Sequence, residues 1–99
     1  MKKLWVDDKR DPKGEGHPDA FWVKTSKRAI AALEADTYDW VSLDHDLGGN
    51  DTGYKVIVYL ENRANEGGAI PTHLGCHSQN PVGKQNILDA IAAIRRRSG

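Results

Sequence analysis

Apolar residues fall into four short runs along the chain, and each run predicts a strand. The runs occupy residues 4–6, 21–23, 40–43 and 70–76, and polar residues follow each of them. Short apolar runs bounded by turn residues are typical of buried strands. Residues 9–20 contain two prolines, two glycines and no apolar periodicity, so we expect a long loop without a helix there.

Three further segments carry apolar residues at helical spacing, residues 26–35, 53–65 and 81–97. Each follows a side chain that can cap a helix, namely Thr25, Thr52 and Asn80. Strands that alternate with helices on short connections predict a parallel α/β sheet. A chain of 99 residues is long enough for one small domain, which we take as residues 1–99.

Charge and cysteine content limit the classes of partner. Lysine plus arginine and aspartate plus glutamate each number 14, so no overall field draws the chain to nucleic acid or to an anionic membrane. Cys76 is the one cysteine, which excludes an internal disulfide and fits a reducing compartment. The apolar run at residues 4–6 is far too short for a signal peptide or a membrane span. We therefore expect a cytoplasmic protein without a membrane partner.

Residues suited to catalysis or metal binding follow three of the four predicted strands. They are Asp7 and Asp8 after the first strand, Asp44, His45 and Asp46 after the third, and His77 and Ser78 after the fourth. The carboxyl ends of parallel strands meet at one edge of the sheet, and open α/β sheets bind their ligands there. We therefore expect these side chains to form one site.

The carboxylates of this set predict a metal site, because hard oxygen ligands of this kind suit Mg²⁺ or Mn²⁺. The candidate ligands are Asp7, Asp8, Asp44 and Asp46. Imidazole can take a proton from attacking water or give one to a departing oxygen near neutral pH. His45 and His77 are therefore the candidates for proton transfer.

The helix that follows Asn80 predicts a phosphate site. Its free backbone N–H groups and the positive end of its dipole attract anions, and Lys84 adds a charge in the first turn. Ser78 and Asn80 can add hydrogen bonds. Two imidazoles, an anion site and a divalent metal together form the set that opening a cyclic phosphodiester requires.

Simpler interpretations stay open at these positions. An acidic pair after a strand often only closes a turn, and Asp46 can bind turn backbone while His45 is solvated. His73, Cys76 and His77 lack the paired spacing of a zinc site, so packing is the better interpretation of the first two.

Four motifs carry a resemblance to a known family. LWVDD, the helix-forming stretch after Thr25, VSLDHDLGGNDTGYKVIVYL and IPTHLGCHS resemble, in order, about the first four-fifths of a receiver domain of two-component response regulators. The trio LWVDD-x-R, SLDHDLG-x-x-x-TGY and HSQNPVG is more closely similar to the receiver-like domains proposed to process cyclic phosphates in phage and bacterial conflict systems. The resemblance implies a truncated, flavodoxin-like sheet of about four parallel strands in the order 2-1-3-4, with three helices.

The resemblance also implies roles for individual residues. It places Asp7 and Asp8 at the metal-binding acidic pair and Asp44 at the phospho-acceptor position. With His45 and His77, Asp44 completes the expected catalytic set. The residues expected to contact the substrate are Arg10, Thr52, Ser78, Asn80, Gly83 and Lys84.

The chain departs from signalling receivers in its connections. A loop replaces the helix between the first two strands, and the fifth strand with its lysine is missing, which argues against phosphoacceptor signalling. The crossover rule then puts all three helices on one face of the sheet. Residues 9–20, the tryptophans or a second copy of the chain are the candidates to cover the other face, so a homodimer is one expected partner state.

Three functions follow, and the first is favoured. The protein is expected to be a phosphoesterase that hydrolyses a cyclic phosphate on a nucleotide or RNA end. The alternatives are a module that binds a cyclic nucleotide without cleaving it, and a receiver-like signalling or interaction domain with Asp44 as phospho-acceptor. Two histidines at the crevice favour chemistry, because a pure binder would prefer arginine for phosphate.

Overall fold

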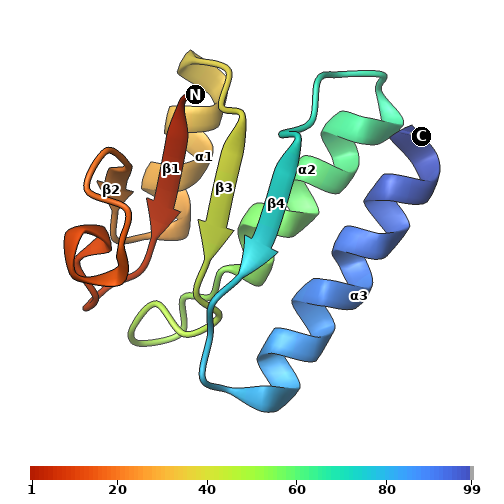
Figure 1. Ribbon diagram of the computed structural model, residues 1–99. Helices are drawn as coiled ribbons and strands as arrows, with labels where there is room; N and C mark the ends of the chain where they lie inside the picture. Colours follow the sequence, from red (N-terminus) through yellow and green to blue (C-terminus); the bar gives the residue numbers. More distant parts are fainter. Residues whose placement is uncertain (99) are drawn as a thin grey trace.

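Four parallel strands form a single sheet in the order β2-β1-β3-β4 (Figure 1). The computed structural model describes residues 1–98. The strands are β1 (Lys3–Val6), β2 (Phe21–Val23), β3 (Trp40–Leu43) and β4 (His73–Cys76). Leu4 pairs with Val41, which in turn pairs with Leu74, so the three longer strands are in register. The predicted α/β class and the strand order 2-1-3-4 are confirmed.

One face of the sheet is covered by helices. They are α1 (Ser26–Ala35), α2 (Tyr54–Asn65) and α3 (Pro81–Ser98). Figure 1 shows α1 and α2 behind the sheet, and α3 along the β4 edge, where it packs against α2. Strand residues that face the helices are almost fully buried, and Ile57 of α2 and Ile87 of α3 join them in one core. Within residues 1–98 no helix is both long and apolar enough to span a membrane.

Two of the three predicted caps are present. Thr25 Oγ1 accepts the backbone N–H of Arg28 at 3.1 Å, and Asn80 Oδ1 accepts that of Gly83 at 3.0 Å. The predicted cap at Thr52 is wrong. Gly53 precedes α2 with helical dihedral angles and no side-chain cap, and its N–H donates to the carbonyl of His45 at 2.8 Å.

The fourth strand is shorter than the predicted run 70–76, because it begins at His73. Pro71 has no N–H to give to a neighbouring strand. The carbonyls of Pro71 and Thr72 accept hydrogen bonds from the Arg95 guanidinium, at 2.9 Å each. The chain before His73 is therefore held by α3 rather than by the sheet.

The loop at residues 9–20 contains one turn of 3₁₀-helix, η1 (Pro12–Glu15), so the expectation of no helix there is wrong. Asp11 caps the turn by accepting the N–H of Lys13 at 2.9 Å, and proline is well suited to the first helical position. Gly16 ends the turn with a φ of 86°, which glycine adopts at little cost.

Aromatic rings cover the face of the sheet that has no long helix. Trp5 is 3% exposed and stacks on His77, with ring centroids 3.8 Å apart. The His17 ring, from the loop at 9–20, lies 4.6 Å from Trp40 and 5.7 Å from Trp5. The loop and the tryptophans therefore cover much of this face, and a homodimer through it stays a prediction.

Gly53 offers a test of the junction between β3 and α2. An added Cβ would overlap the carbonyl oxygen of Asp44, whereas a Cβ on Gly14 would meet nothing within 4 Å. Gly53→Ala is expected to lower the free energy of unfolding by about 1–3 kcal/mol, measured by urea denaturation. Gly14→Ala is the control and is expected to unfold at the wild-type midpoint. Equal midpoints for all three proteins would contradict the close contact.

Candidate functional site

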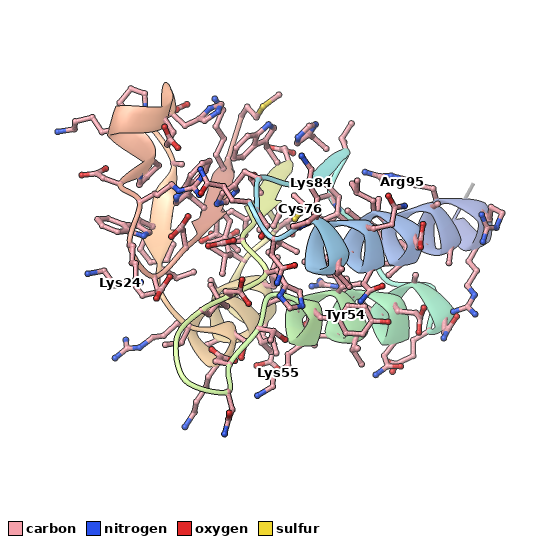
Figure 2. All side chains as sticks on the ribbon, turned by 90° about the horizontal axis from the view of Figure 1, so that it is seen from below. Lys24, Tyr54, Lys55, Cys76, Lys84 and Arg95 are labelled. Carbon is pink, nitrogen blue, oxygen red and sulfur yellow. The ribbon has the colours of Figure 1, made fainter. Side chains whose placement is uncertain are left out.

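Three carboxylates meet at the carboxyl edge of the sheet, the lower edge in Figure 1 and the one that faces the viewer in Figure 2. Asp7 and Asp8 follow β1 and Asp44 follows β3, and one oxygen of each lies within 4.8 Å of the others. They line a cleft of about 320 Å³. Other residues that line this cleft include Lys9, Arg10, Asp46, Gly48 and Thr52. Of the four carboxylates predicted as metal ligands, Asp7, Asp8 and Asp44 therefore lie together, and Asp46 is not part of the group.

The Asp7 carboxylate is 1% exposed and is hydrogen-bonded at both oxygens. Its Oδ1 accepts the backbone N–H groups of Lys9 at 2.9 Å and Arg10 at 3.0 Å. Its Oδ2 lies 3.0 Å from Nε2 of His77. A charge at this depth requires such partners, so they explain both the sharp turn after β1 and the position of His77.

His77 is held by both of its ring nitrogens. Nε2 contacts Asp7, and Nδ1 lies 2.7 Å from Oγ of Ser42, a residue of β3. The Trp5 indole is nearly parallel to the ring, at 7°. Burial lowers the pKa of His77, and the neighbouring Asp7 carboxylate raises it by less. The ring is therefore neutral at physiological pH.

His45 lies apart from this cleft. Its ring packs on the first turn of α3, where a Cβ on Gly83 would come within 2.6 Å of Cδ2 and Nδ1 of the imidazole. His45 lines a second hollow, together with Thr52 from the loop before α2, Tyr54 from α2 and Asn86 from α3. The structure therefore places the two predicted catalytic histidines in different surroundings.

Asp46 lines the acidic cleft, but its carboxylate bonds to His45 and Asn80 and is not part of the group formed by the other three carboxylates. Its Oδ1 lies 3.1 Å from Nδ1 of His45, and its Oδ2 accepts from Nδ2 of Asn80 at 3.3 Å. The hydrogen bond from His45 is the main reason that the pKa of Asp46 is lowered, and the bond from Asn80 adds to it. Among residues 1–98, the group that can surround one ion consists of Asp7, Asp8 and Asp44.

The predicted phosphate site at the start of α3 is largely filled by the chain itself. The N–H groups of Gly83 and Lys84 both bond to Asn80, through its side chain and its carbonyl. Ser78 is buried, and its Oγ accepts the N–H of Asn80 at 3.1 Å. Lys84 is exposed and does not line the acidic cleft. Arg10 and Thr52 are the two predicted substrate contacts that do line it.

Arg10 is fixed at the rim of the cleft. Its Nη1 donates to the carbonyl of His77 at 3.4 Å and lies 3.7 Å from a carboxylate oxygen of Glu15 in η1. Its own carbonyl accepts from Nε1 of Trp5 at 2.9 Å. A guanidinium held in this way is ready to receive an anion without losing much conformational freedom.

Two hydroxyl contacts at the site could not be predicted from the sequence pattern. Ser42 contacts His77, and Ser26 at the start of α1 donates through both its N–H and its Oγ to the carboxylate of Asp51. The second contact ties the loop between β3 and α2 to α1. A serine at a helix start and an aspartate in a glycine-rich turn each predict a local hydrogen bond. Neither predicts which distant residue the side chain contacts.

The acidic group fits a divalent metal ion. Within residues 1–98 the carboxylates of Asp8 and Asp44 make no hydrogen bond or ion pair, whereas Asp7 is oriented by three. Two unpaired carboxylates and one fixed carboxylate are hard oxygen donors, as Mg²⁺ and Mn²⁺ prefer. These three residues can therefore hold such an ion.

A four-stranded parallel sheet of order 2-1-3-4, with acidic residues gathered at the carboxyl ends of β1 and β3, defines a receiver-like domain. Residues 2–93 match the family described as the cyclic-phosphate processing receiver domain, and the chain belongs to this family. No curated protein and no solved structure matches the chain. The predicted family is confirmed, and with it an association of the domain with cyclic-phosphate processing.

The metal assignment is tested by binding of Mn²⁺. Asp8→Asn and Asp44→Asn each remove a ligand, so each is expected to weaken Mn²⁺ affinity by about tenfold or more. Asp46→Asn alters a carboxylate outside the group and is expected to bind Mn²⁺ as the wild type does. Isothermal titration calorimetry gives the Mn²⁺ affinities of wild type and of the three variants. An equal loss in Asp46→Asn would instead make Asp46 a ligand.

The neutral state of His77 predicts a pH dependence of stability. Because the pKa of His77 is below its ordinary value of 6.5, the unfolded chain takes up a proton on this ring before the folded chain does. Its contribution is complete above about pH 6.5 and is lost as the pH falls through the folded-state value. Between about pH 7 and pH 5, stability is therefore expected to fall more steeply in wild type than in His77→Gln. Urea denaturation in EDTA measures this, and parallel profiles would contradict it.

Proposed function

We propose that the protein is a phosphoesterase that hydrolyses a cyclic phosphate on a nucleotide or at an RNA end. The family assignment supports a cyclic phosphate as the ligand. The observation that carries the proposal is the convergence of Asp7, Asp8 and Asp44 in a cleft that Lys9 and Arg10 also line. Carboxylates repel a phosphate, so a cleft of this composition receives one when a divalent ion is bound.

The residues that would hold the ion are Asp7, Asp8 and Asp44. Mg²⁺ or Mn²⁺ bound there supplies charge to the phosphate oxygens and lowers the pKa of a bound water. Arg10 is the side chain that would contact the phosphate directly, because its guanidinium lies at the cleft rim and can pair with two oxygens. Thr52 on the opposite loop can add a hydrogen bond from its hydroxyl.

His77 would act through Asp7. Its Nε2 lies 3.0 Å from Asp7 Oδ2, so the imidazole fixes the buried carboxylate of the acidic group. His45 projects from the other side of the strand end and packs on Gly83. The geometry therefore supports His77 over His45 as the histidine on which the reaction depends.

The proposal is tested with a panel of 2′,3′- and 3′,5′-cyclic nucleotides, with Mg²⁺ or Mn²⁺ and with chelator. Phosphorus NMR distinguishes the cyclic ester from the linear product. Turnover with metal is expected in wild type, with a loss of about 10²–10³-fold in Asp44→Asn. Glu34→Gln, which removes an exposed carboxylate on α1, is the control and is expected to retain full turnover.

Other outcomes decide between the alternatives. Ligand that stays intact but has shifted or broadened resonances would mean a cyclic-nucleotide-binding module. The unpaired carboxylate of Asp44 favours a second candidate, a receiver-like domain with Asp44 as phospho-acceptor. That function would give no linear product, and acetyl phosphate would instead phosphorylate wild type but not Asp44→Asn, which intact-protein mass spectrometry detects.

A further inference from the structure

Three side chains from three different strands or strand ends form a partly buried chain of hydrogen bonds. Ser42 Oγ lies 2.7 Å from His77 Nδ1, and His77 Nε2 lies 3.0 Å from Asp7 Oδ2. Ser42 is 6% exposed and Asp7 is 1% exposed, so water does not compete freely for these groups. The hydroxyl is too deep to attack a substrate, which leaves an indirect role for it.

The direction of these bonds follows from the chemistry of the groups. An ionised carboxylate only accepts hydrogen bonds, so the bond to Asp7 requires the proton of His77 to be on Nε2. A neutral imidazole with that proton can only accept at Nδ1. The hydroxyl of Ser42 is the donor that this nitrogen contacts.

Packing holds the ring, but it does not choose the tautomer. The indole of Trp5 is stacked on His77 at 3.8 Å and 7°, which restricts tilting of the ring without contacting its nitrogens as a donor. A buried nitrogen without a partner is costly, so loss of the hydroxyl would favour rearrangement of the His77 proton or of the ring.

We propose that Ser42 is a positioning residue. Its hydroxyl donates to Nδ1 of His77, stabilises the tautomer with the proton on Nε2 that the bond to Asp7 requires, and so helps to hold the Asp7 carboxylate in the acidic cleft. The part of this role that concerns turnover rests on the proposed phosphoesterase function. The part that concerns the tautomer does not. Partners that orient a ligand in this way are typically worth 10–100-fold in metal affinity or activity.

Long-range ¹H–¹⁵N correlation spectra of the imidazoles test the tautomer directly. Spectra are recorded above neutral pH in EDTA, and the His77 signals are identified from their absence in His77→Gln. Wild type is expected to show a protonated Nε2 and an unprotonated Nδ1. Ser42→Ala is expected to show averaged shifts, and Ser42→Thr, which retains a hydroxyl, is expected to restore the wild-type pattern.

Ser26→Ala is the matched control, because Ser26 is also 6% exposed but bonds to Asp51 instead of a histidine. Its His77 signals are expected to equal those of wild type. A wild-type pattern in Ser42→Ala, or a Ser42→Thr spectrum that resembles Ser42→Ala, would overturn the assignment of the hydroxyl.

Turnover of the cyclic nucleotide provides the second measurement. Ser42→Ala is expected to lower kcat by about tenfold or more while KM stays near the wild-type value. An averaged tautomer with unchanged kcat would overturn the positioning role. If wild type hydrolyses no cyclic phosphate, the proposed function fails, while the NMR spectra still decide whether Ser42 sets the tautomer.

Discussion

The hydrogen bonds to the buried carboxylate of Asp7 are the interaction on which the rest of the site depends. A carboxylate that is 1% exposed is tolerated only when hydrogen bonds replace the water it has lost. Here the hydrogen bonds come from the turn after β1 and from the end of β4. The N–H groups of Lys9 and Arg10 bend the chain sharply after β1, and the imidazole of His77 reaches across from the end of β4. The same bonds therefore start the loop at 9–20, join strands that are not neighbours in the sheet, and leave the acidic cleft with one carboxylate already fixed.

The loop after β1 stands where a signalling receiver has a helix between its first two strands. Aromatic rings under this loop cover the sheet face that such a helix would cover. Trp5 donates from Nε1 to the carbonyl of Arg10, and His17 packs against both Trp5 and Trp40. Aromatic residues suit this position because each ring covers a large apolar area, while a ring nitrogen can still form a hydrogen bond. The arrangement also concerns the site, because Trp5 stacks on His77 as well. Trp5 thus helps to cover this face of the sheet and also packs on the histidine that orients the Asp7 carboxylate.

Local patterns in the sequence predicted most of the fold, and topology predicted the acidic group. The caps at Thr25 and Asn80 depend on the next three residues only, so they could be predicted, whereas the cap at Thr52 failed because Gly53 lies against the carbonyl of Asp44. Asp44 could be placed beside β1 because parallel strands end at one edge. The contact between Ser42 and His77 spans 35 positions, and a serine in an apolar run carries no signal of its partner. Such contacts depend on register and side-chain packing, which the sequence pattern does not specify.

Alternation along a strand explains why Asp44 and His45, which are neighbours in the sequence, do not act as one group. Successive side chains at a strand end project to opposite sides, so Asp44 enters the cleft while His45 turns toward α3. There His45 packs on Gly83 and Asp46 bonds to Asn80, and together they occupy the helix start that would otherwise receive an anion. The basic groups that line the acidic cleft come instead from residues 9 and 10, in the turn that Asp7 itself organises. Asp7, Asp8 and the two basic residues of the cleft therefore come from one short segment, which Asp44 joins from the end of β3. A phosphate bound there would be placed relative to β1 rather than to α3.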